Sequence, residues 1–302
     1  MGEISIWKQG DARKTAITIL LALFLTVIAT IIINPFENNV SKSVISESTI
    51  IPLWTLVAFR TIVAICGVST LIYVVVGVKR EALLYHTTSK EFEIIPMGGL
   101  WRLSTFTCWS FLGLSLAFTT LALCSWAEIL GLGLPNIILQ FAIIIYPVIF
   151  ANSLFVTMVV TFILIPQTHK RGDPLENWFK FPEQMMHNLN TVFLVLELVL
   201  GNLPINLQSI PLVIIFGISY VIFAAYNEKK TGIYFYSFLD PRSSKAAIIH
   251  IALLLGSLIC FGLILLLNIL INQWYLGTII FLLFAVPFIL YVKEPVKQNT
   301  EL

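Results

Sequence analysis

Runs of about twenty apolar residues alternate with short polar stretches along this chain. A bilayer core about 30 Å thick needs roughly 20 apolar residues per helix, and eight segments approach or exceed that length. We place them near residues 15–34, 51–78, 100–124, 136–165, 183–204, 209–226, 246–271 and 275–292. The pattern predicts an all-α, polytopic transmembrane helix bundle of about eight spans.

Composition agrees with this prediction. Of the 302 residues, 58% are hydrophobic and only 11% are charged, far more apolar than a soluble core requires. The polar stretches are too short to bury a core of their own, so we expect no soluble domain.

The cationic residues indicate how the chain crosses the membrane. Lysines and arginines are frequent before the first span, in the stretches 79–99, 166–182 and 227–245, and after the last span, whereas the other side of the predicted topology carries only Lys42. Cation-rich loops stay in the cytosol. We therefore expect both termini to be cytosolic. The net charge of +2 and the dispersed cations predict no nucleic-acid partner.

Two full charges, Arg60 and Glu197, fall well inside predicted spans. Each costs about 2.5–3.5 kcal/mol at the centre of the bilayer on insertion scales, so they should be paired. Counted from the outer ends of their helices they lie at similar depths, roughly 13 and 9 Å at 1.5 Å per residue. The sequence predicts a structural ion pair between them.

A second pair of polar residues shares a depth near the cytosolic side. Thr105 and His187 each lie about 6–8 Å below that surface on the third and fifth predicted spans. A hydroxyl becomes a useful nucleophile when an adjacent base takes its proton, and histidine titrates in the useful range. Both residues could equally serve helix packing. On the fifth span His187, Asn190 and Glu197 fall within about 80° of one another, so this stripe should face inward.

Other chemistries find little support. Cys66, Cys108, Cys124 and Cys260 fall within predicted spans without paired spacing, so neither a disulfide framework nor a metal site is predicted. Phosphate-binding, zinc-protease and serine-hydrolase motifs are missing as well. We expect no cofactor.

Three stretches, in the same order along the chain, carry a resemblance to a known family. They are RLSTF at 102–106, MHNLNTVFLVLEL at 186–198 and GISYVIFAAYNEKKTGIYFYSFLDP at 217–241. Together they resemble the androgen-induced protein family, multi-pass membrane threonine hydrolases that include the androgen-dependent TFPI-regulating protein. The resemblance implies a six-helix membrane core over 51–272, preceded by an anchor helix and outer loop over 1–50 and followed by an extra helix and cytosolic tail over 273–302.

The resemblance also implies a reaction. Thr105 falls on the family's nucleophile and His187 on its histidine, which implies an intramembrane hydrolase of lipid esters such as fatty acid esters of hydroxy fatty acids. Two stretches depart from the family pattern, Thr107-Cys108-Trp109 after the nucleophile and Asn188-Leu189-Asn190 after the histidine, so the substrate could differ.

An oxyanion donor and an orienting group for the histidine are also required. Arg102, Asn188 and Asn190 are candidates for the donor. No residue is evident as the orienting group, because Glu197 is about 15 Å along the helix from His187.

Two other classes of function remain open. A non-catalytic accessory subunit of a larger membrane complex could keep this fold and use the first and last helices to bind partners. A small-molecule transporter would instead use the level of Arg60 and Glu197 as a midplane site. The partners expected in every case include membrane lipids, and for the hydrolase a lipid ester.

Overall fold

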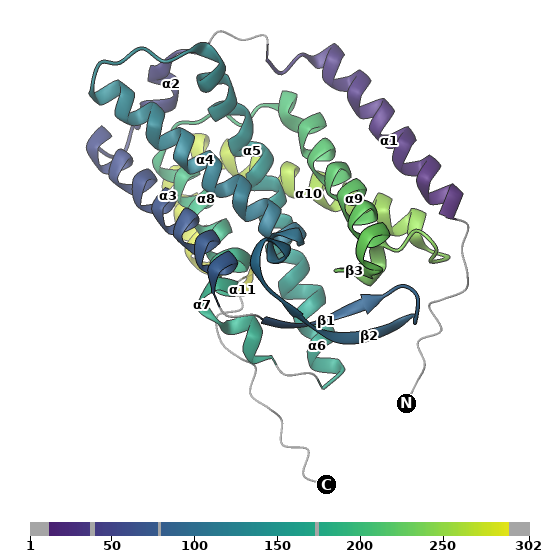
Figure 1. The fold of residues 1–302 in the computed structure, drawn as a ribbon. Coiled ribbons are helices and arrows are strands. Elements are labelled where there is room, and N and C mark those ends of the chain that lie inside the picture. Colours follow the sequence, from purple (N-terminus) through teal and green to yellow (C-terminus); the bar gives the residue numbers. More distant parts are fainter. Residues whose placement is uncertain (1–11, 37–39, 78–79, 173–174, 290–302) are drawn as a thin grey trace.

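The computed structural model describes residues 12–36, 40–77, 80–172 and 175–289. Six helices within these ranges are long and apolar enough to cross a membrane. They are α1 (Ala12–Ile33), α3 (Leu53–Val76), α4 (Phe106–Ile129), α5 (Asn136–Val159) with its continuation to Lys170, α9 (Ile210–Thr231) and α10 (Ala246–Gln273). Figure 1 shows them packed side by side as a helical bundle. The chain is therefore an integral, multi-pass membrane protein.

Two of the eight expected spans differ from that description. The segment expected at 183–204 is a helix built from three pieces, α7 (Phe181–Gln184), a π-helical turn (Met185–Leu189) and α8 (Asn190–Leu200). The segment expected at 275–292 contains α11 (Tyr275–Ile289), 15 residues long, and its last residues lie outside the described ranges. At 1.5 Å per residue, α11 is about 22 Å long, shorter than the roughly 30 Å apolar core of a bilayer.

The third expected span begins later than predicted. Gly99–Ser104 form a 3-10 helix, and α4 starts only at Phe106. Thr105 therefore stands at the N-cap of α4, at a helix end, and not one turn inside a span as the hydropathy pattern predicted.

The stretch 79–99, expected as a plain loop in an all-α protein, contains a β-hairpin. β1 (Arg80–His86) pairs antiparallel with β2 (Glu91–Met97) and, on its other edge, with the two-residue β3 (Ile233–Tyr234). Apolar residues flank a polar Thr-Thr-Ser-Lys turn in this stretch, a pattern typical of a hairpin. The short sheet ties the loop after α3 to the loop after α9.

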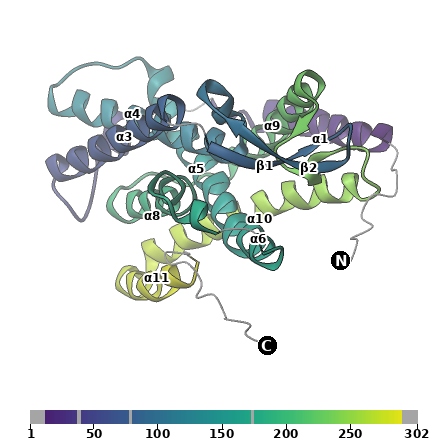
Figure 2. The same ribbon diagram turned by 60° about the horizontal axis from the view of Figure 1, so that its bottom comes forward.

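Two further short elements complete the order. α2 (Lys42–Ser46) lies between α1 and α3, and α6 (Ile165–Lys170) continues α5 after a π-helical turn at Val160–Leu164. The largest apolar core is shared mainly by α3, α4, α5, α8 and α10. Figure 2 shows α1 beside α9 and α10 at one edge of the bundle, and α11 against α10 at another.

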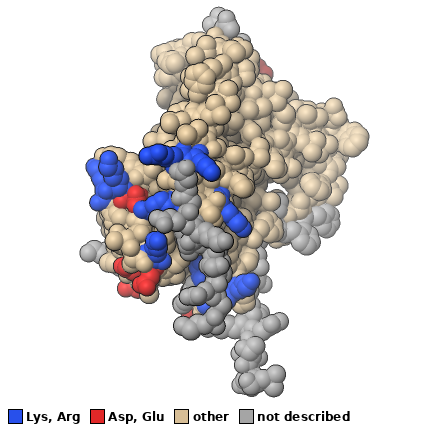
Figure 3. Space-filling view, turned by 90° about the vertical axis from the view of Figure 1, so that its right-hand side faces the viewer, with Lys and Arg blue, Asp and Glu red and all other residues tan. Residues whose placement is uncertain are grey.

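Charged side chains gather at one end of the molecule. Figure 3 shows lysines and arginines grouped around the lower part of the bundle, where the hairpin lies, while the upper part of the visible face is almost entirely uncharged. On the face drawn in Figure 3, the lysines and arginines of the described residues therefore gather at one end of the bundle. The site described next lies at the cationic end.

Candidate functional site

A cavity of about 460 Å³ lies at the hairpin end of the bundle. Its walls come from β1 and β2, the start of α4, α6, the helix at 181–200 and the loop that follows β3. Thr105 and His187 both line it. The two residues matched by depth in the sequence therefore meet at one cavity, which we call the polar hollow.

Thr105 occupies the N-cap position of α4. Its Oγ1 accepts a hydrogen bond from the backbone N–H of Cys108 at 3.2 Å, the usual N-cap interaction. Because Oγ1 acts as an acceptor there, the hydroxyl proton remains available for another partner. Thr105 thus stabilises the helix start and presents an O–H group at the positive end of the α4 dipole.

His187 lies in the π-helical turn at Met185–Leu189. Its ring is 5% exposed and packs against the indole of Trp178, with 5.5 Å between ring centroids. Nδ1 lies 3.8 Å from the Glu183 carboxylate and has no hydrogen-bond partner among the described residues. Nδ1 and the Glu183 carboxylate are therefore within ion-pair distance without being hydrogen-bonded. Single π-turns are frequent at functional sites.

Glu183 is the orienting group that the sequence did not reveal. It is 5% exposed, lines the polar hollow, and its other oxygen accepts a hydrogen bond from Arg80 of β1. The sequence did contain a signal for this role, because an acid and a histidine four residues apart share one face of a helix. Glu183 stood at the predicted start of a span, where a charge is unremarkable.

Tyr236 is a second residue that the sequence did not single out. It lies in the loop after β3 and lines the polar hollow beside Thr107 of α4. Burial raises the pKa of Tyr236 to about 12. The phenol is therefore protonated at neutral pH, so it can donate a hydrogen bond into the hollow.

Of the three oxyanion candidates, Arg102 lines the hollow. The amide of Asn188 donates to Gln184 at 2.7 Å, and Asn190 accepts from Thr157 of α5 at 3.3 Å and from the N–H of Thr191. Neither asparagine is among the residues that line the cavity. The oxyanion role expected for the two asparagines therefore has no support from the lining of the cavity.

The expected contact between Arg60 and Glu197 is present. Nε of Arg60 donates to Oε2 of Glu197 at 3.0 Å, and Nη2 donates to Oε1 at 2.5 Å. The remaining nitrogen, Nη1, donates to the carbonyl of Ile45 and to Ser125. Both charged side chains are completely buried, and neither lines the polar hollow.

The inward stripe on the fifth segment is present too. His187, Asn190 and Glu197 are all at most 5% exposed, so this stripe of the helix faces the interior of the bundle.

The described residues give no indication of a metal site or of a disulfide. Within those ranges no three histidine, cysteine or carboxylate side chains form a group that could hold a metal ion. The four cysteines are free thiols.

No protein-family model matches this chain, and neither a curated protein nor a solved structure matches it. Any assignment of function therefore depends on the geometry of the polar hollow.

Proposed function

We propose that this protein is an intramembrane lipid-ester hydrolase in which Thr105 is the nucleophile and His187 the general base. One observation carries the proposal. The hydroxyl of Thr105 and the imidazole of His187 come from different helices and line one cavity, and the buried carboxylate of Glu183 lies 3.8 Å from the imidazole. Hydrolases activate a hydroxyl nucleophile by placing a base beside it and a third group that orients the base.

The reaction follows from the positions of these groups. As Oγ1 of Thr105 attacks the ester carbonyl, Nε2 of His187 takes its proton. The imidazolium then protonates the departing alcohol, and the acyl group remains on Thr105 as an ester. Water activated by the same imidazole cleaves that ester and releases the fatty acid, and the proton returns to Thr105. Glu183 stabilises the positive ring at each stage, and it is held by Arg80.

The developing oxyanion needs donors near the attacked carbonyl. Tyr236 and Arg102 line the same hollow, and a phenol and a guanidinium both carry hydrogen-bond donors. The N-terminus of α4, directly after Thr105, adds the favourable end of a helix dipole. These groups replace the two asparagines considered from the sequence.

We also infer that the hairpin end of the bundle faces the cytosol. The cationic loops at this end support the inference, and it places both termini in the cytosol if the helix at 181–200 and α11 also cross the membrane. The resemblance to the androgen-induced protein family supports the same reading, with a six-helix core over 51–272 and an added helix at each end. The substrate would be a fatty acid ester of a hydroxy fatty acid or a similar lipid ester, with its carbonyl just below the cytosolic headgroups.

The test uses the full chain in lipid nanodiscs and three variants of Thr105. Thr105→Ser keeps both the cap and the hydroxyl nucleophile, so it should retain ester hydrolysis. Thr105→Asn keeps the helix cap but has no hydroxyl, so it should fold normally and lose hydrolysis. A fluorophosphonate probe should label the wild type and the Ser variant and should not label the Asn variant. Thr120→Ala, on the same helix with its hydroxyl bonded to the Leu116 carbonyl, is the control for loss of a hydroxyl.

His187→Gln should abolish hydrolysis and labelling in parallel. If Thr105→Asn and His187→Gln hydrolyse lipid esters like the wild type, the site is wrong. Stable co-purification with membrane partners and no hydrolysis would favour an accessory subunit. Uptake of a solute that is lost on changing Arg60 would favour a transporter.

A further inference from the structure

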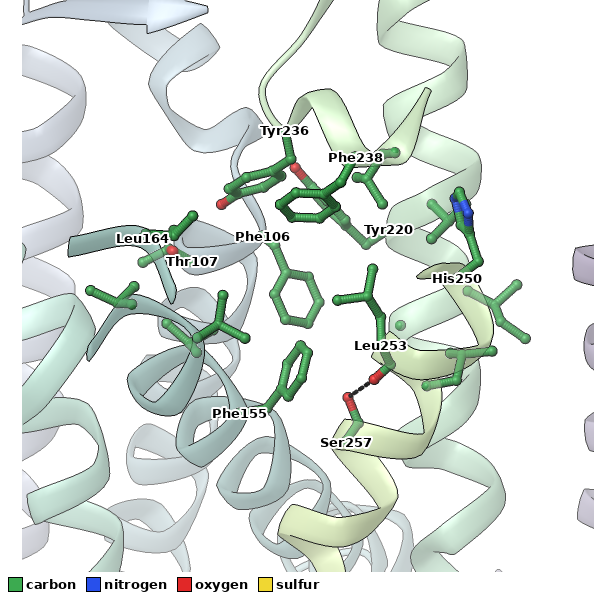
Figure 4. A pocket seen from close by; sticks show the side chains of 18 of the residues that line it. Phe106, Thr107, Phe155, Leu164, Tyr220, Tyr236, Phe238, His250, Leu253 and Ser257 are labelled. Atoms are coloured by element: carbon green, nitrogen blue, oxygen red, sulfur yellow. Dashed lines mark hydrogen bonds between the residues drawn. The ribbon is translucent and has the colours of Figure 1, made fainter. Parts of the chain in front are cut away.

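A second cavity, separate from the polar hollow, lies between α4, α5, α9 and α10. It has a volume of about 80 Å³ and is walled almost wholly by apolar and aromatic side chains. Figure 4 shows Phe106, Phe155 and Leu253 facing one another across it, with Tyr236 and Phe238 at one end. We call it the apolar chamber.

The chamber and the polar hollow share a wall. Thr107, Leu164, Tyr236 and Phe238 line both cavities. Thr107 is two residues from Thr105 along the chain. One layer of side chains therefore lies between the proposed nucleophile and the chamber.

The chamber also reaches the periphery of the bundle. Ile19 of α1 contributes to its wall, and α1 is an edge helix whose large apolar side chains are mostly exposed. An acyl chain that inserts between the side chains of the shared wall and runs through the chamber would emerge beside α1, where the surrounding medium is lipid.

We propose that the apolar chamber binds the aliphatic acyl chain of the ester cleaved at Thr105. This inference rests on the proposed function and adds the binding site for the acyl half of the substrate. The polar hollow supplies charged groups and the chamber supplies apolar ones, which suits a ligand with an ester at one end and a hydrocarbon chain at the other. A cavity of 80 Å³ is smaller than the roughly 150 Å³ cavity that holds a benzene ring. The chamber would therefore take a short stretch of a linear chain, and longer chains would continue past Ile19 into the bilayer.

Tyr236 stands where the two cavities meet. In this arrangement its ring contacts the first carbons of the acyl chain while its hydroxyl faces the carbonyl. Figure 4 shows the hydroxyl directed to the side of Thr107 and the ring beside Phe238. One residue would thus link recognition of the chain to stabilisation of the oxyanion.

The test fills the chamber without touching the reacting groups. Gly217 of α9 lines it, and a Cβ built there meets only Leu254 within 4 Å, at 3.2 Å. Gly217→Ile therefore extends into the chamber. Gly262→Ile on α10, where nothing lies within 4 Å of the added Cβ, is the matched control. Hydrolysis would be measured in nanodiscs on 4-nitrophenyl esters with acyl chains from acetyl to palmitoyl.

We expect Gly217→Ile to lower kcat/KM for palmitoyl and lauroyl esters by at least about 10-fold relative to the acetyl ester, because one surplus methylene group in an apolar pocket already costs about 10- to 200-fold and isoleucine adds four carbon atoms. Gly262→Ile should keep the wild-type chain-length profile. If the wild type is active and Gly217→Ile shows the wild-type profile, the chamber is not the acyl site, although the proposed function stands.

A binding measurement keeps the two proposals apart. A palmitoyl ester with a photoreactive diazirine in mid-chain would be crosslinked to the Thr105→Asn protein and the labelled peptides identified. Labels on α5, α9 and α10, reduced in Gly217→Ile, support the chamber even if the wild type hydrolyses no ester, a result that would refute the proposed function alone. Labels confined to other helices overturn the chamber.

Discussion

The buried ion pair between Arg60 and Glu197 offers the sharpest test of how the bundle is packed. Both side chains have no exposed surface, and five hydrogen bonds occupy the guanidinium, three of them to the carboxylate. The perturbation is a double-mutant cycle of Arg60→Met, Glu197→Leu and the two together. These substitutions remove the charges and keep an apolar side chain of similar length in each place.

The expected changes in the free energy of unfolding follow from which groups lose their hydrogen-bond or ion-pair partners. Breaking a buried pair costs about 3–5 kcal/mol because one charge is left uncompensated, whereas replacing both partners is often nearly neutral. The double variant leaves the Ile45 carbonyl without its donor, which costs about 1–3 kcal/mol. Ser125 keeps a partner, since its hydroxyl also donates to the Leu121 carbonyl at 2.9 Å. The double variant should therefore be more stable than Glu197→Leu.

The two single variants should also differ from each other. A carboxylate left alone by Arg60→Met can be neutralised by a proton, but a guanidinium left alone by Glu197→Leu cannot lose one. We therefore expect Glu197→Leu to be the more destabilising change.

The chain carries its own reporter for this measurement. Cys108, Cys124 and Cys260 are buried free thiols, and Cys66 is partly exposed. A thiol-reactive fluorogenic dye would react with the three buried thiols as the protein unfolds in detergent, with Cys66 giving the baseline. At an unfolding entropy of about 2.1 cal/mol/K per residue, a loss of 3–5 kcal/mol should lower the melting temperature of this 302-residue chain by about 5–8 °C.

The exposed ion pair between Arg242 and Glu228, whose side chains are 45% and 20% exposed, is the control. Glu228→Gln should change stability by at most about 1 kcal/mol. If the effects of Arg60→Met and Glu197→Leu simply add in the double variant, the two charges do not interact and the packing of α3 against α8 is wrong.

Three further predictions concern the site and the ion pair. Glu183→Gln should lower kcat for ester hydrolysis at least about tenfold with little change in KM, because the carboxylate stabilises the positive ring during turnover; equal kcat in a steady-state assay would remove it from the mechanism. Tyr236→Phe should lower kcat by about 10²- to 10³-fold, as expected for one oxyanion donor. Because the neutral phenol donates and burial raises the pKa of Tyr236 to about 12, the wild type should show no alkaline loss of activity near pH 10, where an ordinary tyrosine ionises. Gly201→Ala should destabilise the fold by about 1–3 kcal/mol, because its Cβ would lie 2.6 Å from a carboxylate oxygen of Glu197 in the buried ion pair. The control is Gly133→Ala, which has open space around the added Cβ and should leave stability unchanged in the same dye assay.

Depth along a helix was predictable from the sequence. Arg60 and Glu197 were matched in depth by counting residues from the ends of their spans, and they are in contact. The same count brought Thr105 and His187 to one level, and both line the polar hollow, although Thr105 is the N-cap of α4 and does not lie inside a helical span. Such counting works because every residue of an α-helix adds the same rise and because the bilayer gives all helices a common frame.

Rotation about a helix axis was less predictable. The stripe of His187, Asn190 and Glu197 was predicted from a regular helix of 100° per residue, but the π-helical turn at Met185–Leu189 changes the rotation between residues before and after it. Asn190 consequently packs against Thr157 on α5. Nothing in the run MMHNL distinguishes a π-turn from an α-turn, since the difference arises from packing against neighbouring helices.

Other residues of the site lie in segments that hydropathy predicts to be polar loops, and the sequence did not assign them to the site. Arg80 and Tyr236 lie in such loops, and the short sheet that joins β1 to β3 brings both to the polar hollow. Tyr85 opposite Tyr234 and His86 opposite Ile233 set that pairing, and Gly232 makes it possible by ending α9 with φ of +72° beside the ring of His86. A contact between residues about 150 positions apart leaves no local periodicity. Hydropathy predicts where the helices of such a membrane protein run, because lipid surrounds them. It does not predict how the loops at one end fold. In this chain those loops determine which side chains meet at the polar hollow.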